Sequence, residues 1–437
     1  MLSKLKSLMT HQGVIRYLSN TSWLLGEKIL RMTVGIFVSI WLTRYLGPAQ
    51  FGLYSFAISF VGIFSVIATF GLDEIIVKNL VKRKSKEGEI LLTAFSLKLI
   101  GGFTAILIIA IVAIISTDDL KTIKLIMIVA SAIVFQSFNV VDFFFQAKVL
   151  SKYVVFSNGL VLFISSLLKI TLILIEAPLE AFAWVVLLDS IILAAGLLIF
   201  FSSKSSLTFQ DLRFNKSYAY ILLKESWPLM LSGLVISVYM KIDQIMLKGM
   251  LGNEAVGIYA AAVRLSEAWY FIPLVICSSV FPAIINAKIL NQDLYNERLQ
   301  KLFDSLLILA LIIAVPMTFI STWLAEFLYG NQYSAVGNVL SIHIWAGIFV
   351  FLGIASSKWL IAEDLQIYYT INTTIGMVIN IILNYILIKK FGVEGSAWAT
   401  LIAQFTAAYL SLSFWVKTRP NFLSLSRSLL FFWVIRR

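Results

Sequence analysis

Six basic side chains lie inside long apolar runs of this 437-residue chain: Lys28, Arg31, Lys98, Lys169, Lys241 and Arg264. Burying a charge in such a run is unfavourable, so these residues usually face a polar cavity or a partner. Arginine can hold two oxygens of an anion with parallel hydrogen bonds, whereas lysine acts as a point charge. Four of them are candidate ligands of an anionic group: Lys28 and Arg31, which share a helix face, and Lys241 and Arg264.

Acidic side chains in the same runs favour a competing interpretation. They are Glu27, Asp142, Asp189, Asp243, Glu267 and Asp304. Glu27 precedes Arg31 by four residues, and Glu267 follows Arg264 by three, so each pair could neutralise itself on one helix. Purely structural ion pairing therefore stays open beside anion binding.

A second candidate site consists of side-chain oxygens. Asn380 and Asn384 are four residues apart and place two amide oxygens on one helix face, while Asp243 adds a carboxylate and Thr400 a hydroxyl. One negative charge among neutral oxygens suits a monovalent cation such as Na+, because divalent sites usually carry more carboxylates. Two alternatives stay open: the asparagines only hydrogen-bond neighbouring helices, or Asp243 or Asp189 binds a proton instead. We expect no other metal and no cofactor.

Membrane-spanning helices must position these residues. The chain is 60% hydrophobic and 13% charged, with a mean hydropathy of +0.92, whereas soluble domains are about 25% charged. Runs of about 20 apolar residues can each cross a hydrocarbon core, where the backbone must satisfy its own hydrogen bonds as a helix. The pattern predicts an all-α polytopic membrane protein with twelve spans, at residues 21–43, 51–72, 91–115, 123–146, 154–175, 181–202, 226–248, 255–284, 300–323, 334–361, 368–388 and 394–416.

The basic residues outside the spans predict the orientation. An even number of spans puts both ends of the chain on one side, where the segments hold 23 Lys and Arg against 6 in the opposite loops. Because cytoplasmic loops carry the basic excess, we expect both termini in the cytoplasm. This excess faces the anionic inner leaflet, so the net charge of +12 requires no nucleic-acid partner.

The chain also contains an internal repeat. RYLGPAQFGLYSF at 44–56 is echoed by GMLGNEAVGIYAA at 249–261, and EAFAW at 180–184 by EGSAW at 394–398. An even number of spans separates the copies, so the two halves have the same orientation, as in transporters built from parallel repeats. We expect an N-terminal six-helix lobe at 1–202, a cytoplasmic linker at 203–225, a C-terminal six-helix lobe at 226–418 and a cytoplasmic tail at 419–437.

Two stretches resemble a known family. RYLGPAQFGLYSF with the following FGLDEIIVK, and KIDQIMLKGMLGNEAVGIYAAAVRLSE at 241–267, are similar to the Wzx-type O-antigen flippases. These are polysaccharide transporters of the multidrug/oligosaccharidyl-lipid/polysaccharide (MOP) exporter superfamily. The resemblance covers the whole chain in span count and spacing, and only these stretches in specific sequence.

The resemblance implies a V-shaped pair of lobes that moves an undecaprenyl-pyrophosphate-linked oligosaccharide from the cytoplasmic to the periplasmic leaflet of the bacterial inner membrane. Transport would proceed by alternating access, with the four bases binding pyrophosphate and sugar. The Asp243 and asparagine positions resemble the sodium site of related lipid-linked precursor flippases, where a second carboxylate stands in place of Asn384. We expect a monomer surrounded by membrane lipid, with the polysaccharide polymerase machinery as a candidate partner.

Sequence features disfavour three other functional classes. A multidrug antiporter of the same superfamily typically carries cations, which central bases disfavour. An O-antigen polymerase would need an outer catalytic loop, and the outer loops here are about ten residues or shorter. An ATP-driven pump would need a GxxxxGK[ST] loop. We therefore expect a transporter without bond chemistry, of O-antigen (lipopolysaccharide), capsule or exopolysaccharide units.

Overall fold

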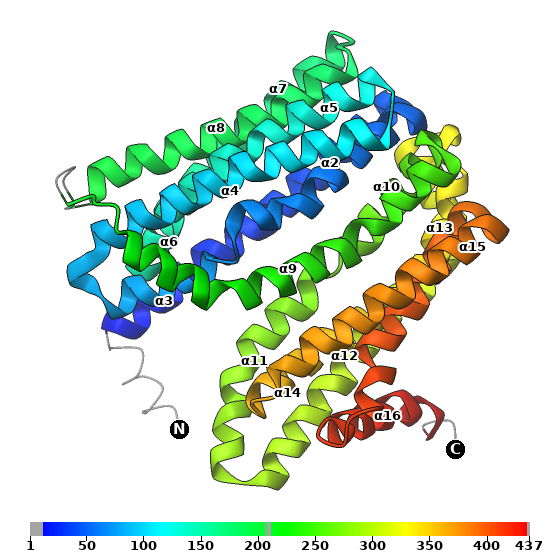
Figure 1. Cartoon of the computed structure of the whole chain (residues 1–437). Coiled ribbons are helices and arrows are strands. Elements are labelled where there is room, and N and C mark those ends of the chain that lie inside the picture. The colour runs from blue at the N-terminus through cyan, green and yellow to red at the C-terminus, as the bar shows by residue number, and fades with distance from the viewer. Residues whose placement is uncertain (1–11, 206, 208–210, 435–437) are drawn as a thin grey trace. The chain divides into compact units, whose positions relative to one another are not determined.

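A computed structural model of the chain describes residues 12–205, 207 and 211–434. The predicted N-terminal segment up to residue 11, four positions of the predicted linker (206 and 208–210) and residues 435–437 lie outside them. The described residues form helices and no strand (Figure 1). The α-helices are α2 (Gln12–Thr69), α3 (Asp73–Lys82), α4 (Glu87–Ser116), α5 (Leu120–Ser131), α6 (Asn139–Ala147), α7 (Lys152–Leu174), α8 (Leu179–Lys204), α9 (Lys216–Leu251), α10 (Asn253–Glu267), α11 (Phe271–Leu290), α12 (Gln292–Tyr329), α13 (Ala335–His343), α14 (Ala346–Ala362), α15 (Gln366–Ala408) and α16 (Arg419–Val434).

Ten segments of the described chain are long and apolar enough to cross a membrane. Two of them consist of two helices joined at a glycine outside the helical region, Gly47 in α2 with φ 68° and Gly392 in α15 with φ 58°. Glycine adopts such positive φ values without the steric penalty of a side chain. Divided at these glycines, the ten segments give twelve passes, in agreement with the predicted all-α architecture.

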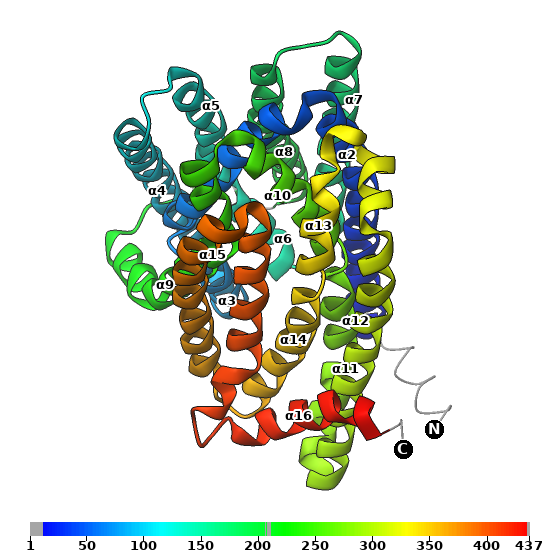
Figure 2. The same cartoon turned by 90° about the vertical axis from the view of Figure 1, so that its right-hand side faces the viewer.

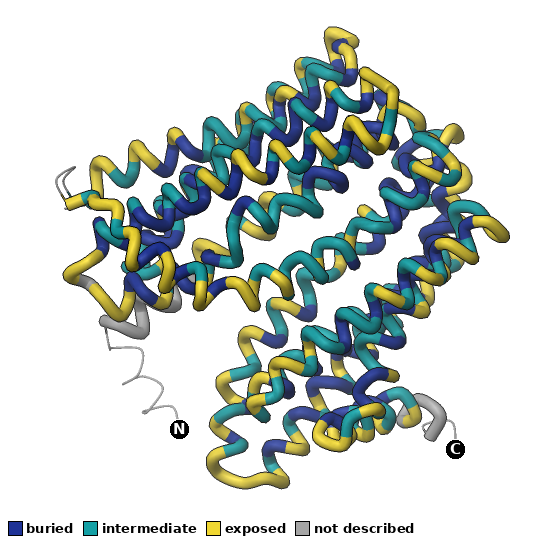
Figure 3. Tube along the Cα trace, viewed as in Figure 1, coloured by how far each residue is buried: buried dark blue, intermediate teal, exposed yellow. Residues whose placement is uncertain are grey.

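The outer surfaces of these helices are apolar. Phe319 in α12 is 82% exposed, and Ile115 in α4 is 79% exposed. Exposed and buried residues alternate along most helices (Figure 3). A soluble protein rarely leaves so much contiguous apolar surface in water, so the exposed faces are those expected to contact lipid.

Contacts between residues divide the chain into two compact units. The first contains residues 1–45 and 60–234, and the second contains residues 46–59 and 235–437. The first has a core around Leu72, Phe145 and Leu222, and the second a core around Phe303, Phe351 and Leu412. The lobe and linker boundaries predicted from the sequence follow the repeats rather than these contacts, and stay predictions.

Residues 419–434, within the predicted C-terminal tail, form α16, which belongs to the second unit. This helix lies across α12 and α14 and contacts both (Figure 2). Polar contacts hold it there: Asn421 Nδ2 donates to Ser356 Oγ at 2.6 Å, and Ser428 Oγ donates to Asp304 Oδ1 at 2.6 Å. Asp304, one of the acids in the apolar runs, therefore has a structural partner.

The two copies of the repeat pack against each other within the second unit. Gly52 lies so close to α10 that an added Cβ would be 1.7 Å from the carbonyl oxygen of Asn253. Gly257 is equally crowded, because its Cβ would be 2.0 Å from the carbonyl oxygen of Pro48. Gly52 and Gly257 are equivalent in the repeat, as are Pro48 and Asn253. The sequence repeat therefore corresponds to a reciprocal contact between two helix starts that only glycine permits.

Candidate functional site

The predicted cation ligands meet in the second unit around the carboxylate of Asp243 in α9. Asn384 Nδ2 donates to Asp243 Oδ1 at 2.6 Å, and Thr400 Oγ1 donates to Oδ2 at 2.8 Å, both from α15. A residue outside the predicted set, Tyr259 in α10, donates its hydroxyl to Oδ2 at 2.6 Å. Asp243 is 5% exposed, so this carboxylate is buried and accepts three hydrogen bonds. The structure thus brings three helical segments together at one negative charge.

The neighbouring amide groups bear on whether a cation fits. Asn380 is fully buried, and its side-chain oxygen and nitrogen have no hydrogen-bond partner among the described residues. Asn384 is also held by a second residue that the sequence analysis missed, because Ser396 Oγ donates to Asn384 Oδ1 at 2.7 Å. An unsatisfied oxygen beside a single carboxylate and a hydroxyl fits a monovalent hard cation. In the described residues no three His, Cys, Asp or Glu side chains gather as a metal site.

Sequence spacing contained a signal for both missed residues. Ser396 precedes Thr400 by four residues and therefore lies on the same helix face. Tyr259 is the second copy of Tyr54 in the repeat, which marked it as a conspicuous position without assigning it a role. Its hydroxyl also lies 2.9 Å from Thr400 Oγ1, so it ties α10 to α15.

The predicted anion ligands fall into the two units, two in each. Lys28 and Arg31 in α2 are exposed residues of the first unit, and Arg31 forms an ion pair with Glu27. Lys241 in α9 and Arg264 in α10 belong to the second unit, where Lys241 is half-buried and Arg264 exposed. The structural alternative of self-neutralisation is thus realised for Arg31.

Arg264 differs from Arg31 because no ion pair with the nearby Glu267 forms within 4.0 Å in the described part of the chain. Its guanidinium carbon lies 5.9 Å from the centroid of the Phe51 ring instead. Lys241, Arg264 and Asp243 are the charged groups that act on the Glu267 carboxylate. Arg264 therefore keeps hydrogen-bonding capacity for an anion.

Two other bases in the apolar runs have structural partners in the first unit. Lys169 Nζ in α7 lies 3.6 Å from Asp189 Oδ2 in α8 and donates to Ser165 Oγ at 2.7 Å. Lys98 Nζ in α4 lies 2.7 Å from Asp73 Oδ1, and Lys98 is only 1% exposed. These contacts assign both lysines to structural ion pairs.

We expect the Asp73→Ala variant to be markedly destabilised, because it leaves the buried Lys98 charge without its hydrogen-bonded partner. Because the Asp73 side chain is 48% exposed, the loss should be smaller than the loss of about 3–5 kcal/mol for a fully buried pair but larger than that for a surface pair. The double variant Asp73→Ala/Lys98→Met should recover much of this loss. The control is Lys78→Ala, whose partner Glu225 is 36% exposed and whose loss is worth about 0–1 kcal/mol. Thermal unfolding in detergent measures all three; equal losses for Asp73→Ala and Lys78→Ala would contradict the assignment.

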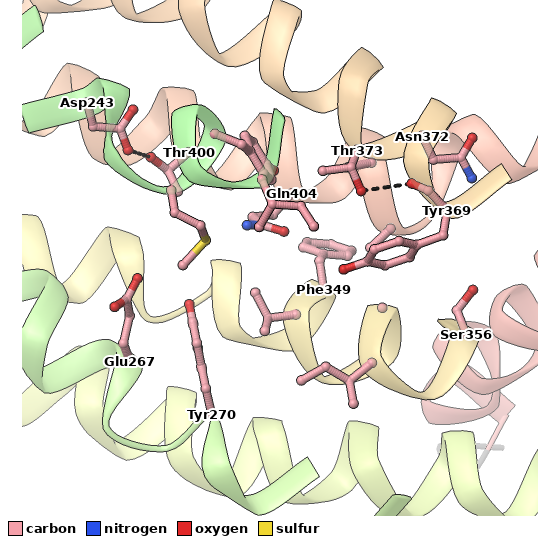
Figure 4. A pocket seen from close by; sticks show the side chains of 18 of the residues that line it. Asp243, Glu267, Tyr270, Phe349, Ser356, Tyr369, Asn372, Thr373, Thr400 and Gln404 are labelled. Carbon is pink, nitrogen blue, oxygen red and sulfur yellow. Dashed lines mark hydrogen bonds between the residues drawn. The ribbon is translucent and has the colours of Figure 1, made fainter. Parts of the chain in front are cut away.

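A cavity opens beside Asp243 and lies wholly within the second unit. Its volume is about 170 Å³. Asp243, Thr400 and Glu267 line one end, and Tyr369 and Asn372 line the other (Figure 4). The arrangement offers one cavity with a buried carboxylate cluster at one end and aromatic and amide groups at the other.

Comparison with protein families decides the class of the chain. The sequence model of the family described as polysaccharide biosynthesis protein matches residues 17–288, which is more than half of the chain. The chain belongs to the polysaccharide biosynthesis protein family. A second family model, MatE, matches residues 228–386. Together they place this family member in the MOP superfamily and confirm the group to which the sequence resemblance pointed.

A curated relative of this family member is the probable flippase AglR of Haloferax volcanii. The two are 29% identical over 182 residues, which cover 40% of this chain and 37% of the relative. The match thus spans well under half the length of that relative.

Solved structures confirm the fold. An inward-facing MATE family multidrug resistance transporter of the MOP superfamily has a TM-score of 0.75 at 14% identity, covering 91% of this chain and 96% of the other. The lipid II flippase MurJ in an inward closed conformation has a TM-score of 0.71 at 18% identity, covering 94% and 91%. At these identities the likeness concerns the fold alone.

Proposed function

We propose that the protein is a flippase for undecaprenyl-pyrophosphate-linked polysaccharide repeat units, carrying them from the cytoplasmic to the periplasmic leaflet of the bacterial inner membrane. The sugar and pyrophosphate cannot cross hydrocarbon, whereas the polyprenyl tail cannot leave it. Alternating access by a polar cavity solves both problems while the tail stays in lipid. Membership of the polysaccharide biosynthesis protein family supports this substrate class.

The observation that carries the proposal is the Arg264 guanidinium, which has no ion-pair partner within 4.0 Å in the described residues although it lies on a membrane helix. A lone guanidinium in a span is unfavourable unless it meets water or an anion. A pyrophosphate offers the pair of oxygens that arginine holds with parallel hydrogen bonds. Lys241 supplies a further positive charge in the same unit, and Lys28 and Arg31 are the candidate anion ligands of the other unit.

A sodium gradient is the proposed driving force, with Asp243, Asn380, Asn384 and Thr400 as the coupling site. The bound ion would supply positive charge that lets the carboxylate stay ionised in a buried place. Asp243 would hold it electrostatically, while Thr400 and the unpaired Asn380 oxygen would complete its shell. Binding requires the Asn384 amide to turn its oxygen to the ion, because its nitrogen now faces Asp243. The alternative is coupling to a proton gradient, with the proton bound by Asp243 or Asp189.

The test is export of surface polysaccharide by a deletion strain, together with flipping of the lipid-linked oligosaccharide in proteoliposomes. We expect Arg264→Ala to lower both at least tenfold, which corresponds to about 1.4 kcal/mol, and Arg264→Lys to restore only part. Arg31→Ala should also lower both, because we expect Arg31 to bind the anion in addition to forming its ion pair with Glu27.

The control is Lys301→Ala, which removes a charge whose partner Glu297 lies on the same exposed helix face. It should export like the wild type. Normal export by both the Arg264→Ala and the Arg31→Ala variants would overturn the role of the bases. Absence of flipping by the wild-type protein would overturn the function itself.

A second candidate function is export of organic cations, which the MatE match to residues 228–386 favours. The cavity also contains two carboxylates, Asp243 and Glu267. This function predicts that cells expressing the protein resist tetraphenylphosphonium and extrude it. Resistance that Glu267→Gln abolishes, without an effect on polysaccharide export, would favour this candidate.

A further inference from the structure

The end of the cavity away from Asp243 has a chemistry that the coupling ion does not use. Phe349 and Tyr369 bring aromatic rings toward this end and Asn372 brings an amide, while Tyr270 lies beside Glu267 and Gln404 lies midway along the cavity (Figure 4). Tyr270 stands at the junction of α10 and α11, Phe349 is in α14, and Tyr369 is in α15. All belong to the second unit, so this composition does not depend on the first.

Two residues that line the cavity each carry a polar atom that is buried and lacks a partner among the described residues. Asn372 is 3% exposed and Tyr239 is 7% exposed. The Asn372 side-chain oxygen and the Tyr239 hydroxyl make no hydrogen bond to any described residue. A buried polar group left unpaired is unfavourable by about 1–3 kcal/mol. Both side chains line the cavity, so a turn of either one would bring its polar atom to a ligand that carries hydroxyl groups.

The charges around the cavity favour an uncharged ligand group. The carboxylates of Glu267 and Asp243 are offset by Lys241 and Arg264, which act on Glu267 electrostatically. The charges of these two acids and two bases sum to zero, so they would not attract an organic cation. A polyhydroxylated ring can instead donate hydroxyl hydrogens to Glu267, to the Gln404 oxygen and to the Asn372 oxygen.

The aromatic rings complete the match. A pyranose ring has apolar C–H faces and a polar hydroxyl rim, so it suits a pocket with aromatic walls and a few convergent polar groups. Pockets for small ligands usually measure about 300–1,000 Å³, whereas this cavity measures about 170 Å³. It is therefore suited to a single sugar ring and not to a larger saccharide.

We propose that this cavity, lined by Tyr239, Tyr270, Tyr369, Asn372 and Gln404, is a subsite for a neutral pyranose ring of the transported saccharide. The inference rests on the proposed flippase function and adds the position at which one sugar ring binds. The pyrophosphate is left to the bases outside this subsite.

The subsite shares two helices with the candidate ion site. Tyr239 precedes Asp243 by one helical turn in α9, and Gln404 follows Thr400 by one turn in α15. An ion that positions Asp243 and Thr400 therefore also positions Tyr239 and Gln404. Because coupling between binding sites is reciprocal, sodium should raise saccharide affinity by the same factor by which the saccharide raises sodium affinity.

The test measures binding of two lipids to the purified full-length protein. The probes are the undecaprenyl-pyrophosphate-linked oligosaccharide extracted from a producing strain and undecaprenyl pyrophosphate, which lacks the sugar. Tyr239→Phe and Asn372→Leu, which keep side-chain size, should weaken binding of the sugar-bearing lipid about tenfold, or about 1.4 kcal/mol. Binding of the sugar-free lipid should not change.

The matched control is Tyr218→Phe, which removes another unpaired buried hydroxyl, in the first unit and outside the cavity. It should alter neither affinity. The subsite would be overturned if Tyr239→Phe weakened the binding of both lipids equally, or if it left both affinities unchanged. It would also be overturned if the cavity preferred tetraphenylphosphonium and Tyr270→Ala removed that preference. Failure of the wild-type protein to bind either lipid would instead overturn the proposed function, and the subsite with it.

Discussion

Replacing Asp243 by asparagine is expected to abolish the sodium dependence of transport. The variant keeps the size of the side chain but removes the only negative charge among the candidate ligands Asn380, Asn384 and Thr400. Sodium affinity should fall at least tenfold, or about 1.4 kcal/mol. Transport in proteoliposomes at constant pH should then no longer rise with a sodium gradient.

A measurement that needs no substrate checks the same prediction. A ligand that binds only the folded protein stabilises it by RT ln(1 + L/Kd), where L is the free ligand concentration, so NaCl should raise the Tm of the wild type above its value in KCl. Asp243→Asn should lose this difference. Tyr259→Phe should retain it, because that variant removes one hydrogen bond to Asp243 and keeps the charge.

Asp189→Asn separates sodium from proton coupling. Asp189 is paired with Lys169 in the first unit, so its substitution should leave the sodium response intact. Transport that ignores sodium, follows a pH gradient and is lost in Asp189→Asn would assign the coupling to protons. A sodium response that survives in Asp243→Asn would contradict the site.

Gly52→Ala and Gly257→Ala should each strongly destabilise the protein. The added Cβ would lie 1.7 Å or 2.0 Å from a backbone carbonyl oxygen, and a backbone cannot move aside as a flexible side chain can. Overpacking usually lowers stability by about 1–3 kcal/mol. Small residues allow close helix approach in membranes, so we also expect lower export. Thermal unfolding in detergent and export by the deletion strain measure the two effects.

Matched controls are a glycine on the same helix as Gly52 and a glycine on α9, the helix that precedes α10 and Gly257. An added Cβ at Gly62 in α2 or at Gly249 in α9 meets no atom within 4 Å. Because alanine is a better helix former than glycine by about 1 kcal/mol, Gly62→Ala and Gly249→Ala should be neutral or stabilising. A Tm of Gly52→Ala equal to that of Gly62→Ala would contradict the close contact of the two repeats.

The sequence alone predicted the helical membrane architecture and the number of passes. An apolar run of spanning length must form a helix in lipid, because only then do its backbone groups satisfy their hydrogen bonds within the run. Glycines at the first-to-second and eleventh-to-twelfth junctions, Gly47 and Gly392, explain why two continuous helical segments still hold two spans each. The repeat was also visible, although its reciprocal glycine contact was not, because spacing along a chain says nothing about which two turns touch.

The candidate ion ligands were also predictable, since Asn380 and Asn384 share a face by helical periodicity and Asp243 is a rare buried acid. Tertiary structure alone decided which charges are free. Arg31 and Arg264 have the same local pattern, a base with an acid three or four residues away, yet one forms its pair and the other does not. It also decided that Lys98 and Asp73 pair at a separation of 25 residues, and that Tyr239, Tyr270 and Asn372 share one cavity. The physical reason is that local periodicity fixes which side chains share a helix face, whereas partners on other helices are chosen by the packing of those faces in three dimensions.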